Sequence, residues 1–317
     1  MFKYILFFII AFIGLNAQDD TETKKYRVKA KIERVDNNES SESDSLKSSE
    51  FREWDFGFWG MNSFNDLRRP TIELEYGMNE AYYNKDVFSQ EFNANNRFMG
   101  KIGLASYGET IAGSGLLKYE FGSLFVGHSL GNTNELSESG LLNTSITSFG
   151  AMSSNGYGYT LADNFFILLT HGSGLSWNLV NFSDTENIID ASEIDLINVM
   201  DDGVRFGEIY EAGIKIRLAE NIGLSTTYSE NLIMPRFMFW YWSLGKIIEG
   251  TSHGLADLFV NRVKKTSPEL VPILYFVVKN GISYGFNRLR EKNMNWPSET
   301  APPLFQRNVN IGISFIF

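Results

Sequence analysis

The chain contains no cysteine, and this absence excludes several classes of protein. A small domain held by disulfides, a metal centre with cysteine ligands and an enzyme with a catalytic thiol all need that residue. Positive charge is also scarce, because 28 lysine and arginine residues stand against 38 aspartate and glutamate residues, for a formal net charge of −10. A nucleic-acid-binding surface needs a basic excess, so nucleic acid is excluded as a partner.

Long apolar runs are missing after the first residues of the chain. A membrane-spanning helix needs about 18 or more uninterrupted apolar residues, and no stretch beyond residue 15 offers them. The sequence also has no dinucleotide-binding fingerprint, no phosphate-binding loop and no cluster of metal ligands. We therefore expect no cofactor and no bound metal.

The first 17 residues have the layout of a secretory signal peptide. A lysine precedes an apolar run that ends at Leu15, and the small residue Ala17 comes before an acidic segment. Because the run is shorter than the roughly 20 residues that span a bilayer, we expect export by the general pathway with cleavage after Ala17. Residues 18–50 then predict a flexible acidic and polar arm, since they offer little apolar surface to bury.

From residue 51 to residue 317, apolar residues recur mostly at every second position, which is typical of β-strands. The last strand is the clearest, with one apolar face and one small polar face; the two faces are Val309, Ile311, Ile313, Phe315 and Phe317, and Asn308, Asn310, Gly312 and Ser314. Small polar residues suit the lumen of a transmembrane barrel, whereas a soluble β-sandwich carries charges on its outer face. A sheet can cross lipid only if it is closed, so we predict an all-β antiparallel transmembrane barrel, with a secreted soluble β-protein as the alternative.

The alternating segments allow the strands to be counted. They are separated by Gly, Asn and Ser, and Glu220-Asn221 forms the tight turn of a hairpin. The predicted strands before the last are Trp54–Phe58, Ile72–Tyr76, Lys101–Tyr107, Leu117–Phe121, Leu124–Val126, Ile146–Met152, Tyr157–Leu161, Phe165–Thr170, Leu175–Phe182, Ala212–Leu218 and Ile222–Tyr228. We expect about eight to twelve strands, with ten as the single best number.

With its signal peptide, its lack of cysteine, its amphipathic strands and its terminal Phe317, the chain resembles the outer-membrane β-barrel proteins of bacteria. The resemblance covers roughly residues 51–317. It implies a place in the outer membrane, contact with outer-membrane lipid, and recognition of the last strand, with Phe315 and Phe317, by the barrel-assembly machinery. Other proteins of the envelope are further partners that such a barrel could contact.

Two insertions depart from the period of two. Residues 184–205 mix apolar and acidic residues, which predicts an acidic amphipathic helix or loop. A calcium loop is the alternative, but Asp201-Asp202-Gly203 lacks its alternating acids. Residues 235–292 contain apolar side chains at helical spacing, namely Phe237, Trp240, Tyr241, Leu244, Ile247 and Ile248.

The second insertion has several possible placements. An aromatic amphipathic helix beside a barrel can lie in the membrane interface, fold into the lumen as a plug, face a partner, or pack in an ordinary core. Its last part, residues 267–292, is ambiguous as well. Ser267-Pro268-Glu269 predicts the start of a helix, whereas Asn280-Gly281 predicts a β-hairpin turn.

Catalytic candidates are few, because the chain has only three histidines. His171 and Ser173 are two residues apart on a predicted strand, so they share a face on which the imidazole could activate the serine. Their spacing is similar to a His-x-Ser-Asn-Gly stretch of outer-membrane phospholipases and to a like stretch of lipid A deacylases. That resemblance implies His171 as the base and Ser173 as the nucleophile. However, Gly174 replaces the asparagine, and Thr185 stands where the family has its third polar group.

Three functions are compatible with these features. The first is an accessory or structural barrel of the membrane without catalytic activity. The second is a narrow transport barrel for small solutes, and the third is a lipid hydrolase that uses His171 and Ser173. A barrel of about ten strands has little lumen beyond its own side chains, whereas open porins have about sixteen to eighteen strands. We therefore expect the accessory role first.

Overall fold

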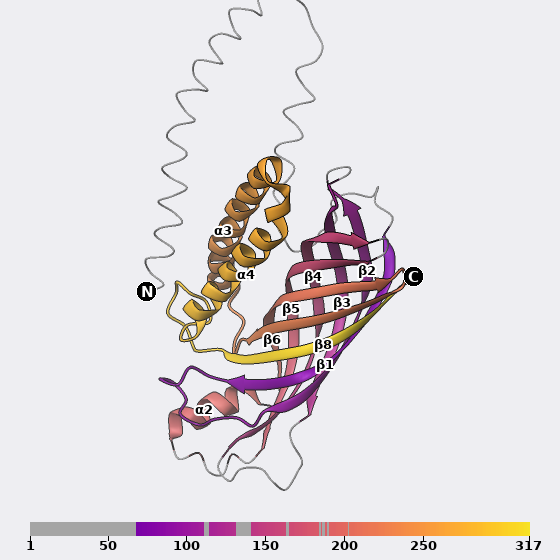
Figure 1. Ribbon diagram of the computed structural model, residues 1–317. Coiled ribbons are helices and arrows are strands. Elements are labelled where there is room, and N and C mark those ends of the chain that lie inside the picture. The colour runs from indigo at the N-terminus through magenta and orange to yellow at the C-terminus, as the bar shows by residue number, and fades with distance from the viewer. Residues whose placement is uncertain are drawn as a thin grey trace, which may run out of the picture. The chain divides into compact units, whose positions relative to one another are not determined.

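The computed structural model describes residues 68–110, 114–130, 141–162, 165–183, 185, 188, 190–201 and 203–317. In this part of the chain, eight antiparallel strands form a closed barrel (Figure 1). The expected signal peptide at 1–17, the arm at 18–50 and the strand at Trp54–Phe58 lie outside the described residues. The closed ring of antiparallel strands confirms the expected all-β antiparallel barrel.

Each strand pairs with its neighbours in sequence, and β1 pairs with β8 to close the ring. In the closing pair, Thr71 lies opposite Ile316 and Tyr82 lies opposite Phe305. Closure leaves no edge strand with unpaired backbone groups. The strands are β1 (Arg69–Tyr82), β2 (Asn95–Glu109), β3 (Leu116–Leu130), β4 (Asn143–Ala162), β5 (Phe165–Ser183), β6 (Val204–Ala219), β7 (Ile222–Ile233) and β8 (Leu304–Ile316).

The number of strands is eight, so the expectation of ten was wrong. The two predicted segments that flank Ser153-Ser154-Asn155-Gly156 form one strand, β4, and the two that flank His171 to Gly174 form β5. Both small polar stretches continue the ladder, with Asn155 opposite His171. A Cβ on Gly174 would lie 2.3 Å from the carbonyl oxygen of Ala151. The glycine therefore permits close approach of two strands where it resembled a turn residue in the sequence.

The two faces of the barrel wall differ sharply in polarity. Ile311 on β8 is 71% exposed, whereas its neighbour Asn310 is 1% exposed and points into the lumen. The same alternation runs round the barrel, where exposed outward side chains include Leu74, Tyr76, Met78, Phe98, Ile102, Leu104, Leu124, Val126, Phe149, Leu224 and Val309. The predicted faces of the last strand are confirmed.

Buried ion pairs cross the lumen. The Lys101 Nζ on β2 lies 2.7 Å from Oε1 of Glu75 on β1 and 2.6 Å from Oε2 of Glu211 on β6. The Lys215 Nζ on β6 lies 2.8 Å from Oε2 of Glu73 on β1. Because β2 and β6 are opposite each other in the ring of eight, the bridge from Lys101 to Glu211 spans the interior of the barrel.

Apolar layers lie on both sides of these ion pairs. Along β2, Met99 precedes Lys101 and Ala105 follows it, and each belongs to a buried cluster inside the barrel. The first cluster contains Met99, Phe125, Met152 and Ile209, and the second contains Ala105, Tyr119, Phe121, Phe166 and Leu168. Side chains thus fill the interior, as expected for a barrel of about eight strands.

The connections are short at one end of the barrel and long at the other. Helix α2 (Ala191–Met200) lies in a long connection, between β5 and β6. Asp190 caps it by accepting hydrogen bonds from the backbone and hydroxyl of Ser192, which lower the pKa of the Asp190 carboxyl. Ile197 and Met200 of α2 join a buried cluster with Phe88 and Phe92 from the connection after β1. This cluster packs the barrel end that carries the long connections.

The connection between β7 and β8 contains a helical hairpin. It consists of α3 (Phe239–Thr266), the short 3-10 helix η2 (Pro268–Leu270) and α4 (Val271–Arg290). The hairpin lies outside the barrel against β4, β5 and β6 (Figure 1), so it does not plug the lumen. By length and hydropathy together, none of the helices among the described residues qualifies as a membrane-crossing helix.

The ambiguous segment at 267–292 is a helix, so the alternative of a β-hairpin at Asn280-Gly281 is wrong. Asn280 sits in the middle of α4, where its Nδ2 donates to the carbonyl oxygen of Phe276 at 2.9 Å. Its Oδ1 lies 2.9 Å from Nδ1 of His171 on β5. The tertiary contact therefore outweighs the local preference of Asn-Gly for a turn.

The ion pairs in the lumen predict a large loss of stability for Lys101→Met. The substitution leaves the buried carboxylates of Glu75 and Glu211 without their shared partner, which costs roughly 3–5 kcal/mol. We expect a correspondingly lower urea midpoint for the refolded protein in detergent, measured by tryptophan fluorescence. Lys85→Met is the control, because the Lys85 side chain is 84% exposed and its ion pair with Glu91 lies at the surface. Equal midpoints for the two variants would contradict the prediction.

Candidate functional site

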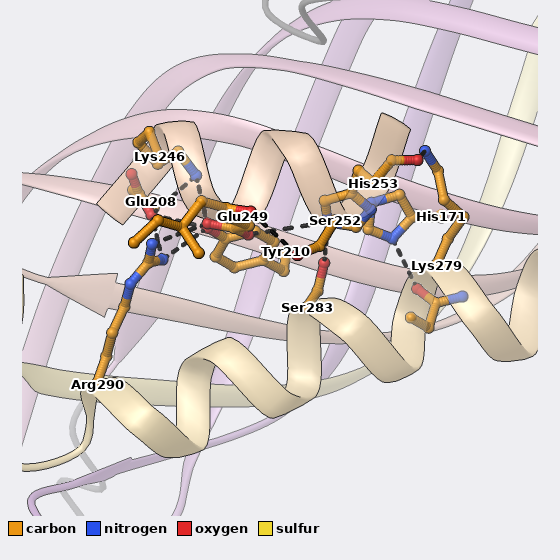
Figure 2. A network of polar contacts seen from close by, with 12 residues as sticks. His171, Glu208, Tyr210, Lys246, Glu249, Ser252, His253, Lys279, Ser283 and Arg290 are labelled. Carbon is orange, nitrogen blue, oxygen red and sulfur yellow. Dashed lines mark hydrogen bonds and ion pairs between the residues drawn. The ribbon is translucent and has the colours of Figure 1, made fainter. Parts of the chain in front are cut away.

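Four buried polar side chains interrupt the apolar outer wall on β5, β6 and β7. They are His171, Glu208, Tyr210 and Glu230, and we call them the polar stripe; their exposed fractions are 6%, 1%, 6% and 3%. On β6, Glu208 and Tyr210 alternate with Glu211, which binds Lys101 inside the lumen, so the stripe points outward. The α3–α4 hairpin covers the stripe, and Figure 2 shows its contacts with His171, Glu208 and Tyr210.

The first contact between stripe and hairpin is a cluster of balanced charge. Arg290 of α4 donates from Nη1 to Oε2 of Glu208 at 3.0 Å and from Nη2 to Oε2 of Glu249 at 2.8 Å. Lys246 of α3 lies 3.3 Å from Glu208 and 3.0 Å from Glu249. The Tyr210 hydroxyl donates to Glu208 at 2.7 Å (Figure 2). Two carboxylates and two cations thus compensate one another where water has little access.

The second contact centres on two histidines. The rings of His171 on β5 and His253 on α3 stack with centroids 5.2 Å apart. Nδ1 of His171 lies 2.9 Å from Oδ1 of Asn280, and Nε2 of His253 lies 3.3 Å from the Ser283 hydroxyl. Lys279 of α4 donates to Asp257 of α3 at 2.8 Å, which joins the two helices.

The third contact surrounds Glu230 on β7. Its Oε1 accepts hydrogen bonds from Arg288 Nη2 at 2.7 Å and from the Tyr228 hydroxyl at 2.7 Å. Its Oε2 accepts from Asn287 Nδ2 at 2.8 Å. Arg307, from β8, lies 3.2 Å away from the same carboxylate. Each member of the polar stripe therefore has a partner in the hairpin.

The histidine and serine proposed as catalytic do not form a dyad. Among the described residues, no hydrogen bond joins His171 to Ser173, and the His171 ring contacts Asn280 and His253 under the hairpin. Ser283 and His253 are close, but Glu249 approaches the same ring nitrogen, Nε2, at 3.9 Å. A catalytic triad needs its acid on the other nitrogen. These side chains hold the hairpin against the barrel wall, and we call the three contacts together the docking interface.

No group in the described part of the chain brings together three side chains of His, Asp or Glu that could hold a metal ion. The charges of the docking interface instead balance, as for Arg290 and Lys246 with Glu208 and Glu249. This pairing leaves the interface suited to holding two parts of the chain together.

Most of the apolar residues predicted at helical spacing are exposed, on α3 or just before it. Trp240 is 81% exposed, and Phe237, Tyr241, Leu244 and Ile247 are also exposed, while Ile248 is half-buried. Phe237 also packs on Phe206 of β6, with ring centroids 4.5 Å apart. In the last strand, Phe315 is half-buried and Phe317 is 68% exposed.

Of the polar stripe, only His171 was singled out from the sequence, as a catalytic candidate; Glu208, Tyr210, Glu230 and their partners were not predicted. One signal was available, because Glu208 interrupts an otherwise uncharged outward set on β6, which contains Phe206, Tyr210, Ala212 and Ile214. A carboxylate on the outer face of a membrane barrel needs a cationic partner from another part of the chain. The partner, Arg290, lies 82 residues further along the chain, so spacing alone does not identify it.

Comparisons with known proteins give no family. No family model matches the sequence, and no curated protein matches it. Among solved structures, Neisserial surface protein A is similar at 10% identity, with 78% of this chain and 97% of that chain covered and a TM-score of 0.32. Ail, the attachment invasion locus protein of Yersinia pestis, in complex with the heparin analogue sucrose octasulfate, has 7% identity, coverages of 79% and 99%, and a TM-score of 0.30.

The outer membrane protease OmpT from Escherichia coli has 7% identity, coverages of 81% of this chain and 99% of that chain, and a TM-score of 0.23. These neighbours are outer-membrane β-barrel proteins, the general class that the sequence resembles. At such low identities and scores they identify no family and transfer no activity.

The docking interface predicts that Arg290→Met loosens the hairpin. Glu208 and Glu249 lose a shared, buried partner, at a cost of roughly 3–5 kcal/mol. We expect a lower urea midpoint and faster tryptic cleavage after Lys264 or Lys265, near the end of α3. Lys292→Met is the matched control, because Lys292 follows α4 and its ion pair with Asp86 lies at the surface, with side chains 57% and 72% exposed. Cleavage of Arg290→Met at the rate of the control would refute the role of this contact.

Proposed function

We propose that the protein is a structural or accessory component of the bacterial outer membrane without catalytic activity. The observation that carries the proposal is the polarity of the closed barrel, which is apolar outside and polar inside. Ile102 and Ile311 are 61% and 71% exposed on the outer wall, whereas Lys101 and Asn310 are buried in the lumen. This polarity suits a barrel surrounded by lipid and is the reverse of a water-soluble one.

The lengths of the connections support an orientation in the membrane. Outer-membrane barrels have short turns on the periplasmic side and longer loops outside the cell. Here the short connections, such as Glu220-Asn221, lie at the barrel end that carries Phe317. We infer that this end faces the periplasm, where the barrel-assembly machinery would meet the last strand, and that α2 lies on the outer side.

Transport of solutes through the lumen is disfavoured by its contents. The ion pair from Lys101 to Glu211 crosses the interior, and the cluster around Phe125 and Met152 fills the neighbouring layer. A solute would have to displace both. We therefore propose the accessory role rather than transport through a narrow barrel.

Lipid hydrolysis is disfavoured by the surroundings of His171. The ring is 6% exposed and bound to Asn280 of α4, so lipid cannot reach it while the hairpin is docked. Ser173 has no hydrogen bond to a base among the described residues, as the sequence motif would require. We therefore assign no catalytic role to this pair.

The surface near the long connections offers a place for a partner in the envelope. An open hollow of about 740 Å³ lies there, between β5, α2, the start of β6 and the segment that leads from β7 to α3. Its lining combines aromatic rings with two guanidinium groups; it is formed by Trp177, Val199, Val204, Arg205, Phe206, Met234, Pro235, Arg236 and Phe237. Aromatic and arginine side chains are common at protein interfaces, which supports an accessory role.

The membrane barrel predicts heat-modifiable migration on gels. A closed sheet with no edge resists mild detergent, so the unboiled protein should migrate differently from the boiled protein. It should also remain in the outer-membrane fraction after washing with high salt. A protein that is released by the wash and shows no shift would refute the proposal.

The filled lumen predicts no conductance. In planar bilayers, the wild-type protein should give no stable current steps, because Lys101 and Glu211 bridge the interior. An open porin in the same bilayer serves as the positive control. Discrete steps from the purified wild-type protein would favour the transport barrel over the structural role.

A further inference from the structure

The exposed side of the helical hairpin carries no charge along most of its length. Every residue in Trp240–Phe259 and Val271–Leu289 is described, and none of the exposed ones is charged. The exposed residues are Trp240, Tyr241, Leu244, Ile247, Gly250, Thr251, Leu255, Leu258 and Phe259 on α3, and Ile273, Val277, Gly281, Tyr284 and Leu289 on α4. The hydroxyl of Thr251 donates back to the carbonyl oxygen of Ile247 at 2.7 Å, so it needs no water.

The charged residues of the same segments face the barrel or each other. Lys246, Glu249 and Arg288 contact the polar stripe, and Asp257 pairs with Lys279 between the helices. A hairpin that packs on a protein in water has the opposite arrangement, with its apolar stripe on the protein and its charges in solvent. The exposed face of this hairpin therefore suits surroundings that are less polar than the barrel wall that its inner face contacts.

The hairpin runs along the height of the barrel wall. It starts after Ile233 and returns before Leu304, at the end with the long connections. Near its tip, Val260, Val271 and Tyr275 pack against Leu116, the first residue of β3, at the end with the short connections. The helices thus extend from one end of the wall to the other.

The ends of the hairpin match the two boundaries of a bilayer. Phe239, Trp240 and Tyr241 stand at the beginning of α3, and Arg262, Lys264 and Lys265 stand near its end. At 1.5 Å per residue, α3 rises about 33 Å from Trp240 to Arg262, and the hydrocarbon core of a bilayer is about 30 Å thick. Aromatic and basic side chains both favour the interfaces with water.

Neither helix is apolar enough to cross a membrane by itself, but here the barrel wall covers their polar side chains. We propose that the α3–α4 hairpin lies within the membrane beside the barrel, with its outer face in contact with lipid acyl chains. The inference rests on the proposed function, because it needs the barrel to be in a membrane. Acyl chains are the occupant because the exposed face of the hairpin has the same character as the neighbouring outer wall, where Leu224 and Ile311 are exposed. The hairpin takes the place that lipid would otherwise occupy over the polar stripe.

The test uses the natural absence of cysteine, which allows single spin labels without other changes. The variants Leu258→Cys and Val277→Cys place a label on the exposed face of each helix. Ile311→Cys is the control for the lipid-facing wall, and Glu220→Cys is the control for a turn in water. Each labelled protein is folded into vesicles of phosphatidylethanolamine and phosphatidylglycerol. The accessibility of the label to oxygen and to a water-soluble nickel chelate is then measured by power saturation.

We expect the ratio of oxygen to nickel accessibility at Leu258 and Val277 to equal that at Ile311 and to be several-fold higher than at Glu220. If the ratio at Ile311 indicates lipid but the ratio at the hairpin labels equals that at Glu220, the hairpin lies in water. The inference about the hairpin then fails, while the proposed membrane barrel stands. If the hairpin labels are shielded from both reagents, a protein surface covers them and the inference also fails. If Ile311 itself has the ratio of Glu220, the membrane barrel is wrong and the proposed function fails first.

Discussion

A polar group on the outer wall of a membrane barrel needs a partner from its own chain, and much of this structure follows from that constraint. A charged side chain that faces lipid at the middle of a barrel costs about 2–4 kcal/mol for lysine or arginine and less for carboxylates. Glu208 and Glu230 stand on the outer wall and are nearly fully buried, because Arg290 and Arg288 of the hairpin bind them. The carboxylates of the outer wall therefore need the hairpin, because it supplies the cations that pair with them.

The same constraint governs the lumen, where the solution is different. Inside, the partners are opposite strands of the barrel, as in the contact of Lys101 on β2 with Glu211 on β6. A removed partner leaves a buried charge in either place, so both sets of ion pairs bind specific neighbours and define a single arrangement. Inside, this arrangement joins the two sides of the ring; outside, it joins the ring to a helical insertion.

The sequence was sufficient for the class of fold but not for its details. The alternation from Asn308 to Phe317 predicted both faces of β8, because a period of two is a local property. The joining of segments in β4 and β5 was missed, since glycines such as Gly174 serve close packing between strands and look like turn residues. The pairing of Glu208 with Arg290, across 82 residues, depends on the closed barrel and has no local signal.

The position of the hairpin was open for a related reason. Helical spacing of Trp240, Leu244 and Ile247 defines an apolar face, but it does not say whether that face meets protein or lipid. The contacts of the opposite face show which side of the helix meets the barrel, because Lys246 pairs with Glu208 and Glu249 accepts from the Tyr210 hydroxyl. Glu208 and Glu230 of the wall find their cations in the hairpin, and Lys246 and Arg290 of the hairpin find their carboxylates in part on the wall. Each part therefore supplies the partners that the buried polar groups of the other part need.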